Sequence, residues 1–571
     1  MLTLKTYLTL LPIFMLAIAA GRWAFIPSGR LPRHRVRVMR LRLRLRLHPG
    51  RGHATALELW LRWGRFAAWR QAAQSRPSLS AWQRARRPAE HSILLGRAHF
   101  RHALRLPLDE HALVLAPPRT GKTAMLGAAI LRYPGPVLST TTKHDVFKYT
   151  SGVRARLGPV HVFNPQGIGG VPSTFGWSPI PGCEDPAVAI RRADHFAAAL
   201  KCEGDNAFFQ RAAGSYLRGM FHAAALVRNG DMRLVGRWAL TGTKGGAVDA
   251  EQILRQNGAG NWADELGQLR GAAERTSATN EMVMGQMLGF MADPALAASV
   301  LPAGDSGLDF AEFLRSRGSL YLIADSDHDE SPLAPLFAAL AAELHYVAAL
   351  EGQASAAGRL DPPLLMALDE IVQTCPIALP KYCADSGGKG IQIITVAHGE
   401  AQLASRWGEH GKQAIIDTAG VLVLLPGIKD ESTLRMVSGL CGTAAYRVRG
   451  QEHDSHHEVM PPAMLRQLPK GRALIIRSGF SPVIAKLARV WREHAYRKAR
   501  RRGETVAVLT PAAAALASPA GREVTGSPAS PWPVRGEIRD VAPCSHDLDR
   551  EAAELAEVLP RDDTRHPWMS P

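Results

Sequence analysis

The chain has 571 residues, 46% of them hydrophobic, and a formal net charge of +18. This length exceeds what one hydrophobic core usually organises, so we expect two or more domains with tails, and the positive charge indicates a polyanionic partner, either nucleic acid or an anionic membrane surface. Six scattered cysteines without a CxxC pair argue against a disulfide framework or a zinc site, and they fit a reducing, cytosolic location for the main body.

The N-terminus contains an apolar stretch, Tyr7–Ala20, which resumes as Trp23–Ile26 after Gly21 and Arg22. A membrane-spanning helix needs ~20 apolar residues, so the uninterrupted stretch is short. It could be a membrane anchor, an uncleaved signal-like segment or a buried core helix, and the absence of a convincing cleavage site argues against a cleaved signal. We predict a membrane anchor over residues 1–29. Because positive charge follows it, everything beyond Arg30 is predicted to lie in the cytoplasm.

Residues 30–92 form a predicted basic juxtamembrane region. Arginine alternates with leucine or valine over much of Arg33–Leu47, which predicts an extended segment with one cationic and one apolar face. Attraction to anionic lipid headgroups is the first interpretation and DNA contact the second. Further arginines then occur among tryptophans, and we interpret this part as an interfacial helical region that is separate from the catalytic unit; the tryptophans are Trp60, Trp63, Trp69 and Trp82.

A phosphate-binding loop is the clearest motif. A predicted strand at residues 111–115 leads into Ala116–Thr123 (APPRTGKT) and then into a helix-like stretch. Backbone N–H groups of Arg119, Thr120, Gly121, Lys122 and Thr123 would surround the β-phosphate of ATP at the start of that helix. Lys122 would contact the β- and γ-phosphates, and the Thr123 hydroxyl would bind Mg²⁺. Ala116 replaces the first glycine of the usual motif, and we expect nucleotide binding to survive this change.

An acidic pair supplies the partner that such a loop requires. The apolar run Leu364–Leu368 predicts a buried strand, and Asp369 and Glu370 follow at its carboxyl end, where ligands collect in open α/β sheets. Asp369 would hold Mg²⁺, directly or through water, and Glu370 would act as the general base toward the attacking water.

The remaining pattern predicts an α/β fold with a mostly parallel sheet. Further strands are expected at 136–141, 159–164, 319–324, 391–397, 421–426 and 472–477, with a helix at 333–350. Between about Asp185 and Leu301 the chain lacks convincing strands, so we predict an inserted all-α subdomain over 185–310. It would divide the nucleotide-binding domain into parts 93–184 and 311–502, followed by a disordered tail over 503–571.

From about Ile93 to about Trp491 the chain resembles the type IV secretion coupling proteins, the TraG/TraD family of conjugative DNA-transfer ATPases. The resemblance is carried by LLGR (94–97), the phosphate loop, TKHDVFKYT (142–150), NPQG and FGWSPI (164–180), LLMALDE (364–370), residues 387–408 and residues 468–491. It implies a RecA-like P-loop NTPase, a homo-hexamer with ATP and Mg²⁺ at subunit interfaces, and attachment to the inner membrane. The implied partners are single- or double-stranded DNA, a relaxase or relaxosome, and the proteins of the secretion channel.

Two positions depart from the pattern of that family. His398 stands where the family's third motif usually carries a glutamine that senses the γ-phosphate, so we assign it a catalytic sensor role that responds to pH, beside the alternative of a strand-end histidine. The chain also has one apparent membrane segment where relatives often have two. A ring site usually needs an arginine from the neighbouring subunit, and Arg435 is one candidate.

Weaker patterns leave alternatives open. His453, His456 and His457 suggest a metal site, although a solvated loop fits them better. The basic pair Arg191–Arg192 and the cluster Arg497–Arg502 suggest contact with DNA phosphates, although solvated faces are the default. An FtsK-like DNA translocase and a nucleotide-binding receptor with little turnover remain alternatives to the DNA-transfer ATPase.

Overall fold

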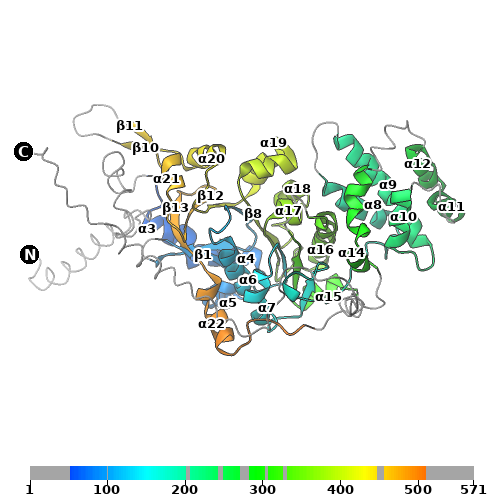
Figure 1. Cartoon of the computed structure of the whole chain (residues 1–571). Coiled ribbons are helices and arrows are strands. Elements are labelled where there is room, and N and C mark those ends of the chain that lie inside the picture. The colour runs from blue at the N-terminus through cyan, green and yellow to red at the C-terminus, as the bar shows by residue number, and fades with distance from the viewer. Residues whose placement is uncertain are drawn as a thin grey trace, which may run out of the picture. The chain divides into compact units, whose positions relative to one another are not determined.

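A computed structural model describes residues 52–98, 101–200, 206–241, 249–270, 282–301, 307–325, 331–446 and 455–509 (Figure 1). The predicted membrane anchor, the arginine-rich run at 33–47, His453 and the chain beyond residue 509 lie outside these residues.

An eleven-stranded sheet organises the fold, in the order β2-β1-β13-β12-β9-β3-β8-β7-β4-β6-β5. Seven neighbouring strands are parallel: β9 (Val421–Leu424), β3 (Ala112–Leu115), β8 (Ile391–Ala397), β7 (Leu364–Leu368), β4 (Val137–Thr141), β6 (Ser319–Ile323) and β5 (Val160–Phe163). Four antiparallel strands extend the sheet on the β9 side: β12 (Arg472–Arg477), β13 (Val483–Leu487), β1 (Ser92–Arg97) and β2 (Ala103–Pro107). The predicted mostly parallel sheet is confirmed. All eight strands expected from apolar runs are present, with ends within two residues of the expectation.

Helices cover both faces of this sheet because its parallel strands are apolar on both sides. Along β3, Leu113 and Leu115 belong to one buried cluster and Ala112 and Val114 to another, as expected for a strand between two layers. The helices around the sheet are α6 (Lys122–Arg132), α7 (Asp145–Arg154), α15 (Phe310–Arg315), α16 (Ala334–Ala354), α17 (Ile371–Thr374), α18 (Leu379–Asp385), α19 (Glu400–Thr418), α20 (Glu431–Cys441), α21 (Pro462–Arg466) and α22 (His494–Arg501). Within the described residues, α16 alone is long and apolar enough to cross a membrane, and 78% of its apolar window is buried inside the protein.

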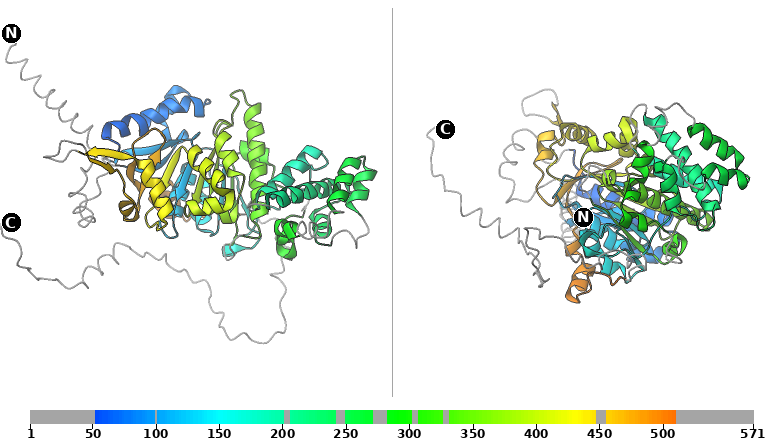
Figure 2. Two further views of the ribbon diagram at one scale, coloured as in Figure 1. Left: turned by 90° about the horizontal axis from the view of Figure 1, so that it is seen from above. Right: turned by 45° about the vertical axis from the view of Figure 1, so that its right-hand side comes forward.

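The described residues of the inserted region contain helices and no strand, and they form a group of helices beside the sheet (Figures 1 and 2). Its helices are α8 (Pro186–Ala198), α9 (Asn206–Leu226), α10 (Met232–Thr241), α11 (Ala250–Gln256), α12 (Gly260–Arg270) and α14 (Pro294–Ala298).

The contact between the inserted helices and α16 involves the basic pair Arg191–Arg192, which was expected to be a solvated face. Arg191 and Arg192 of α8 both pair with the buried Glu343 of α16, at 3.0 and 3.1 Å, and Arg191 lies 3.7 Å from the ring centre of Tyr346. Burial would raise the pKa of Glu343, but the hydrogen bonds and charges of the two arginines hold that pKa below its usual range. The expectation that this arginine pair is a solvated face is therefore wrong, because the pair joins two helices.

The segment before the first strand also differs from expectation, because it packs against the antiparallel half of the sheet. It consists of α3 (Ala56–Glu58), the π-helical turn η1 (Leu59–Trp63), α4 (Arg65–Ser75) and α5 (Ala81–Arg86). Leu59 and Trp63 are fully buried in the same cluster as β1, β2 and β13. This segment is thus part of the folded sheet domain.

Two smaller features concern the ends of the domain. Past residue 502 the chain continues along α7, where Gly152 N–H donates to Thr505 O (3.0 Å) and Ala507 N–H donates to Ser151 Oγ (3.1 Å). His456 and His457 lie in β11 (Ser455–Glu458), which pairs with β10 (Thr443–Tyr446). No group of three metal-ligating side chains occurs among the described residues.

Candidate nucleotide site

The phosphate loop connects the carboxyl end of β3 to the start of α6. Arg119 (φ 62°) and Gly121 (φ 99°) both have left-handed backbone conformations, which turn successive N–H groups toward the same concave side. Gly121 precedes α6, whose N-terminus has no side-chain cap. Among the hydrogen bonds of the described residues, none occupies the N–H groups from Arg119 to Ala124. The loop therefore presents unpaired donors at the positive end of a helix, an arrangement that suits an anion.

The first half of the loop is fixed to its surroundings. Ala116 is fully buried and donates its N–H to Ala397 O at the end of β8 (2.9 Å). The Thr120 hydroxyl donates to Pro117 O (2.7 Å), which closes the turn from within. The described geometry therefore accommodates alanine at position 116, and the two prolines fall where no N–H is needed.

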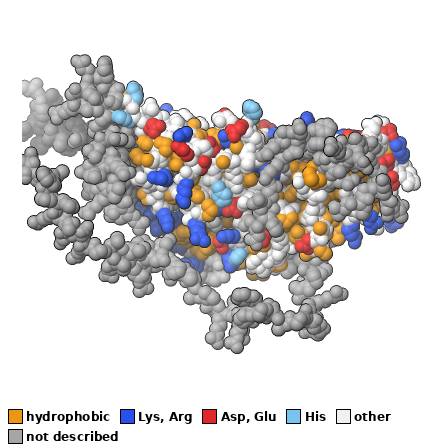
Figure 3. Space-filling model, turned by 45° about the horizontal axis from the view of Figure 1, so that its top comes forward, with side chains coloured by type: hydrophobic (Ala, Val, Ile, Leu, Met, Phe, Trp, Pro, Cys, Tyr) orange, Lys and Arg blue, Asp and Glu red, His pale blue; other side chains and the backbone are white. Residues whose placement is uncertain are grey.

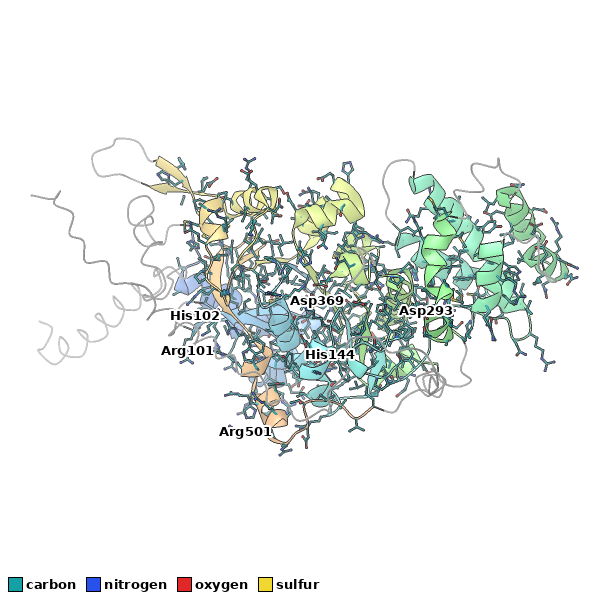
Figure 4. All side chains as sticks on the ribbon, in the orientation of Figure 1. Arg101, His102, His144, Asp293, Asp369 and Arg501 are labelled. Atoms are coloured by element: carbon teal, nitrogen blue, oxygen red, sulfur yellow. The ribbon has the colours of Figure 1, made fainter. Side chains whose placement is uncertain are left out.

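The acidic pair lies beside this loop because β8 alone separates β7 from β3 in the sheet. The Lys122 ammonium contacts Glu370 Oε1 directly and lies 3.8 Å from Asp369 Oδ1. Glu370 itself has a left-handed backbone (φ 49°), which is uncommon for a residue with a side chain and is often associated with functional sites. Figure 4 shows Asp369 within the sheet part of the protein. Lys122, Asp369 and Glu370 thus form one largely buried cluster, called here the Lys122 cluster.

A further member of this site was not predicted. The hydroxyl of Thr142, immediately after β4, donates to Glu370 Oε2 (2.9 Å), so the two carboxylate oxygens of Glu370 have different partners. Thr140 and Thr374 hydroxyls donate to the carbonyl oxygen of Asp369, at 3.2 and 3.0 Å. A run of threonines at the end of a strand that neighbours β7 was the available signal for Thr142.

The two carboxylates differ in their electrostatic state. Burial raises the pKa of Asp369 to about 6; Lys122 opposes this rise and the charge of Glu370 adds to it. Burial would also raise the pKa of Glu370, but the hydrogen bond and charge of Lys122, followed by the Thr142 hydrogen bond, hold that pKa below its usual range. Glu370 is therefore ionised at neutral pH, as a general base must be.

Asp369 meets the requirements for a magnesium ligand. Its Oδ1 atom is buried, has no hydrogen-bond partner and faces Lys122 at 3.8 Å, so this carboxylate oxygen would become available for Mg²⁺ when Lys122 turns to the phosphates. Mg²⁺ in phosphate-binding sites is usually held by one or two protein oxygens together with phosphate and water oxygens, so a larger ligand group is not needed. The half-buried Thr123, in the first turn of α6, would supply the second protein oxygen.

His398 follows β8 and lies next to the loop. Its Nδ1 is 3.3 Å from Ala116 O, and because a carbonyl oxygen only accepts, Nδ1 must carry the proton of the neutral ring. Nε2 is then an acceptor and becomes a donor to a phosphate only after protonation. Burial, followed by the charge of Lys122, lowers the pKa of His398. The sensor role predicted for His398 would therefore strengthen as pH falls.

The structure brings most of the predicted site residues to one edge of the sheet. Ala116, Lys122, Asp369, Glu370 and His398 are connected by the contacts given above. The side chain of Arg119 is exposed at this edge, as are those of Lys143 after β4 and Lys429 after β9. Arg435 lies on the surface of α20 and pairs with Glu431 (2.6 Å).

Comparisons with known proteins agree with this geometry. The profile of a protein family described as the TraM recognition site of TraD and TraG matches residues 363–470. A search of curated protein sequences finds no match.

Solved structures with the same fold include a bacterial conjugative coupling protein, TrwBdeltaN70 (TM-score 0.53, 19% identity, covering 67% of this chain and 86% of that one). Plasmid coupling protein TrwB in complex with the ATP analogue ADPNP gives a TM-score of 0.51 at 19% identity, covering 68% of this chain and 88% of that one. TrwB in complex with ADP and Mg²⁺ gives 0.50 at 17% identity, with coverages of 67% and 87%.

Proposed function

We propose that the chain is a coupling protein of type IV secretion, of the TraG/TraD family, and that it is a membrane-attached ATPase that couples ATP hydrolysis to the movement of DNA in conjugative transfer. The family profile over residues 363–470 and the fold shared with the conjugative coupling protein TrwB support this proposal. The observation that carries this proposal is the Lys122 cluster beside a row of unpaired N–H groups at the start of α6. Anion-binding donors, a mobile cation and two carboxylates of different pKa are what phosphoryl transfer from ATP to water requires.

The residues would act in a definite order. The N–H groups from Arg119 to Thr123 bind the phosphates of ATP, and Lys122 leaves Glu370 to contact the β- and γ-phosphate oxygens. Asp369 and Thr123 would hold Mg²⁺, which supplies positive charge to the phosphate oxygens. Glu370, released by Lys122 but still held by Thr142, accepts a proton from the attacking water.

The remaining parts of the proposal concern partners. The net charge of +18 favours association with DNA, and lysine and arginine side chains gather over the sheet-containing part of the face drawn in Figure 3. The family description points to a protein of the relaxosome or secretion machinery as partner. We further propose a homo-hexamer, attached to the inner membrane through residues 1–29, with the sheet domain in the cytoplasm.

Steady-state ATP hydrolysis by the full chain tests this function, measured without DNA, with single-stranded DNA and with double-stranded DNA. We expect DNA to increase the rate and Lys122→Ala to abolish it, while the exposed Lys381→Ala serves as a matched control with unchanged rate. ATP binding without hydrolysis under all three conditions would favour the nucleotide-binding receptor. A Lys122→Ala defect in chromosome segregation with normal plasmid transfer would favour the FtsK-like translocase.

A further inference from the structure

Large apolar side chains are concentrated on the outer side of the N-terminal helices. Twelve large hydrophobic residues are exposed among the described residues, and five of them lie within positions 57–82. These five are between 40 and 60% exposed: Leu57, Trp60, Leu61, Phe66 and Trp82. The other seven are spread over the rest of the chain, so this concentration is a property of one surface, called here the aromatic–arginine surface.

The surface is rigid because its inner side is firmly attached to the sheet. Trp63, on the buried side of η1, packs edge-on against Phe480 with ring centres 5.8 Å apart. Glu58 accepts a hydrogen bond from Ser481 N–H (2.9 Å), and Arg76 pairs with Asp361 at 2.5 Å. In the left view of Figure 2, the blue helix of this segment lies outside the sheet with no other described element above it.

The two helices that carry the surface are joined to each other. The Arg65 guanidinium donates to Ala85 O (3.0 Å), and the Trp69 indole N–H donates to Ala81 O (3.2 Å), so α5 stays beside α4. Phe66 stacks with Trp69 at 5.9 Å between ring centres, and the Arg86 guanidinium lies 4.5 Å from the Trp82 ring centre. Aromatic rings and arginines are thus interleaved along α4 and α5.

Positive charge predominates on this face. Its exposed arginines are Arg62, Arg65, Arg70, Arg86 and Arg87. The acidic residues between 52 and 91 are Glu58 and Glu90; Glu58 is engaged by Ser481, and Glu90 lies 3.8 Å from the buried Arg76. Neither carboxylate neutralises the exposed arginines, so the face remains cationic.

We propose that the aromatic–arginine surface rests on the anionic lipid surface of the membrane. Helices that insert apolar side chains at the level of lipid headgroups typically combine tryptophan, phenylalanine and leucine with arginine. Arginine can bury its apolar stem there and leave its charge among phosphates. Nucleic acid would engage the arginines and the rings but offers nothing to Leu57 and Leu61, so lipid accounts for more of the surface.

The position of this surface along the chain agrees with that occupant. Residues 27–51 separate the apolar N-terminal stretch from the first described residue. Twenty-five residues span no more than about 90 Å when fully extended, so the surface lies within that distance of any bilayer that holds the apolar stretch. This step rests on the membrane attachment proposed above. A surface bound to lipid would fix the orientation of the sheet domain, because α3–α5 are rigidly joined to it.

Tryptophan fluorescence in proteoliposomes tests the proposal on the full chain. All samples in this comparison carry the substitution Trp23→Phe, which removes the tryptophan of the apolar stretch. They are reconstituted in vesicles of phosphatidylcholine and phosphatidylglycerol, with or without bromine on the acyl chains. We expect bromine to quench part of the emission, and this quenched part to fall by more than half in Trp60→Phe/Trp82→Phe. Trp491→Phe, which removes an exposed tryptophan of η6 (Val490–Arg492), should leave it unchanged.

Omitting phosphatidylglycerol should weaken the quenching of Trp60 and Trp82 several-fold, because the arginines then lose their counter-charge. Equal quenching with and without these two tryptophans would overturn the proposal. Two other results would also overturn it. Absence of quenching together with loss of self-association in the double variant would indicate a subunit interface. Absence of quenching together with a change of emission on adding oligonucleotide would indicate a nucleic-acid site. The measurement needs no ATP, so its result does not depend on the proposed ATPase function. Quenching of Trp23 in the unsubstituted chain reports on the membrane anchor alone. Failure of the anchor and failure of the surface proposal can therefore be distinguished.

Discussion

Two largely buried charged clusters lie on different halves of the sheet, and they are built in opposite ways. On the antiparallel side, Arg477 of β12 forms an ion pair with Glu110 and donates to Arg62 O and Gln71 Oε1, both at 3.2 Å. On the parallel side, one cation, Lys122, faces two carboxylates, and Asp369 Oδ1 has no hydrogen-bond partner.

The difference separates a cluster that holds elements together from one prepared for a ligand. Arg477 is planar, has several fixed donors and lies near the rings of Trp63 and Phe480, at 5.3 and 4.6 Å from their centres. Lysine has one mobile point charge, which can transfer from a carboxylate to a phosphate. In this protein the Arg477 cluster, whose charged groups all have partners, has a structural role. The Lys122 cluster, which has an oxygen without a hydrogen bond and lies beside unpaired N–H groups, is the candidate ligand site.

The largest expected effect is the loss of turnover in Glu370→Gln. The amide keeps the shape of the side chain but cannot accept a proton from water, so we expect kcat to fall by about 10²–10⁴. Nucleotide binding should persist, because Lys122 gains rather than loses freedom. Single-turnover hydrolysis together with equilibrium ATP binding checks both statements, and a parallel loss of binding would show that Glu370 has a different role.

Breaking the Arg477 cluster should instead destabilise the fold. Arg477→Met leaves Glu110 partly buried without its cation and removes the contacts to Trp63 and Phe480, so we expect a loss of about 3 kcal/mol in the free energy of unfolding. Urea unfolding in detergent measures it. The exposed Arg435→Met, whose partner Glu431 is also exposed, is the matched control and should cost less than about 0.5 kcal/mol. Equal effects of the two changes would contradict the comparison.

The Lys122 cluster should respond to Asp369→Asn in the opposite direction. With a pKa near 6 in the folded state and an ordinary value of 3.8, Asp369 keeps a proton that the unfolded chain releases, so the free energy of unfolding falls as pH rises from about 4 to 6. Asp369→Asn should remove this fall and stabilise the nucleotide-free chain at pH 7 by about 3 kcal/mol. Unfolding curves across pH 4–7 decide the point, and a destabilised variant at pH 7 would refute it. The same change should abolish Mg²⁺-dependent hydrolysis.

A smaller effect is expected at Thr142, which we infer to be a positioning residue for Glu370. Thr142→Val removes the hydroxyl without changing the size of the side chain. Because one hydrogen bond to the charged Glu370 is lost, we expect kcat to fall about tenfold while KM for ATP changes little. Thr142→Ser keeps the hydroxyl and should restore most of the rate. If serine and valine behaved alike, the hydrogen bond would not be the cause.

The predictability of these features from sequence depends on the range of their interactions. The parallel strands were recognisable because each is a continuous apolar run, and Asp369 and Glu370 were recognisable because they end such a run. Strands β1, β2 and β13 were missed, since glycine or charged residues such as Arg105 and Lys486 interrupt their apolar character.

Partners that are distant along the chain could not be inferred. Glu343 is about 150 positions away from Arg191 and Arg192, and Thr142 is 228 positions away from Glu370. Trp60 and Trp63 show the same difficulty at short range, because one is exposed and the other buried, and a local pattern of tryptophan and arginine does not say which side meets the sheet.

Equilibrium binding of ATP with Mg²⁺ to the full chain, measured by isothermal titration calorimetry, tests the role of the Lys122 cluster most directly. We predict saturable binding by the unsubstituted chain, retained binding in Arg477→Met at a temperature where that variant is folded, and a loss of at least about tenfold in affinity in Lys122→Ala, the effect of removing one charge-assisted contact to phosphate. Unchanged affinity in Lys122→Ala would contradict the account, because the phosphates would then bind elsewhere than at the start of α6.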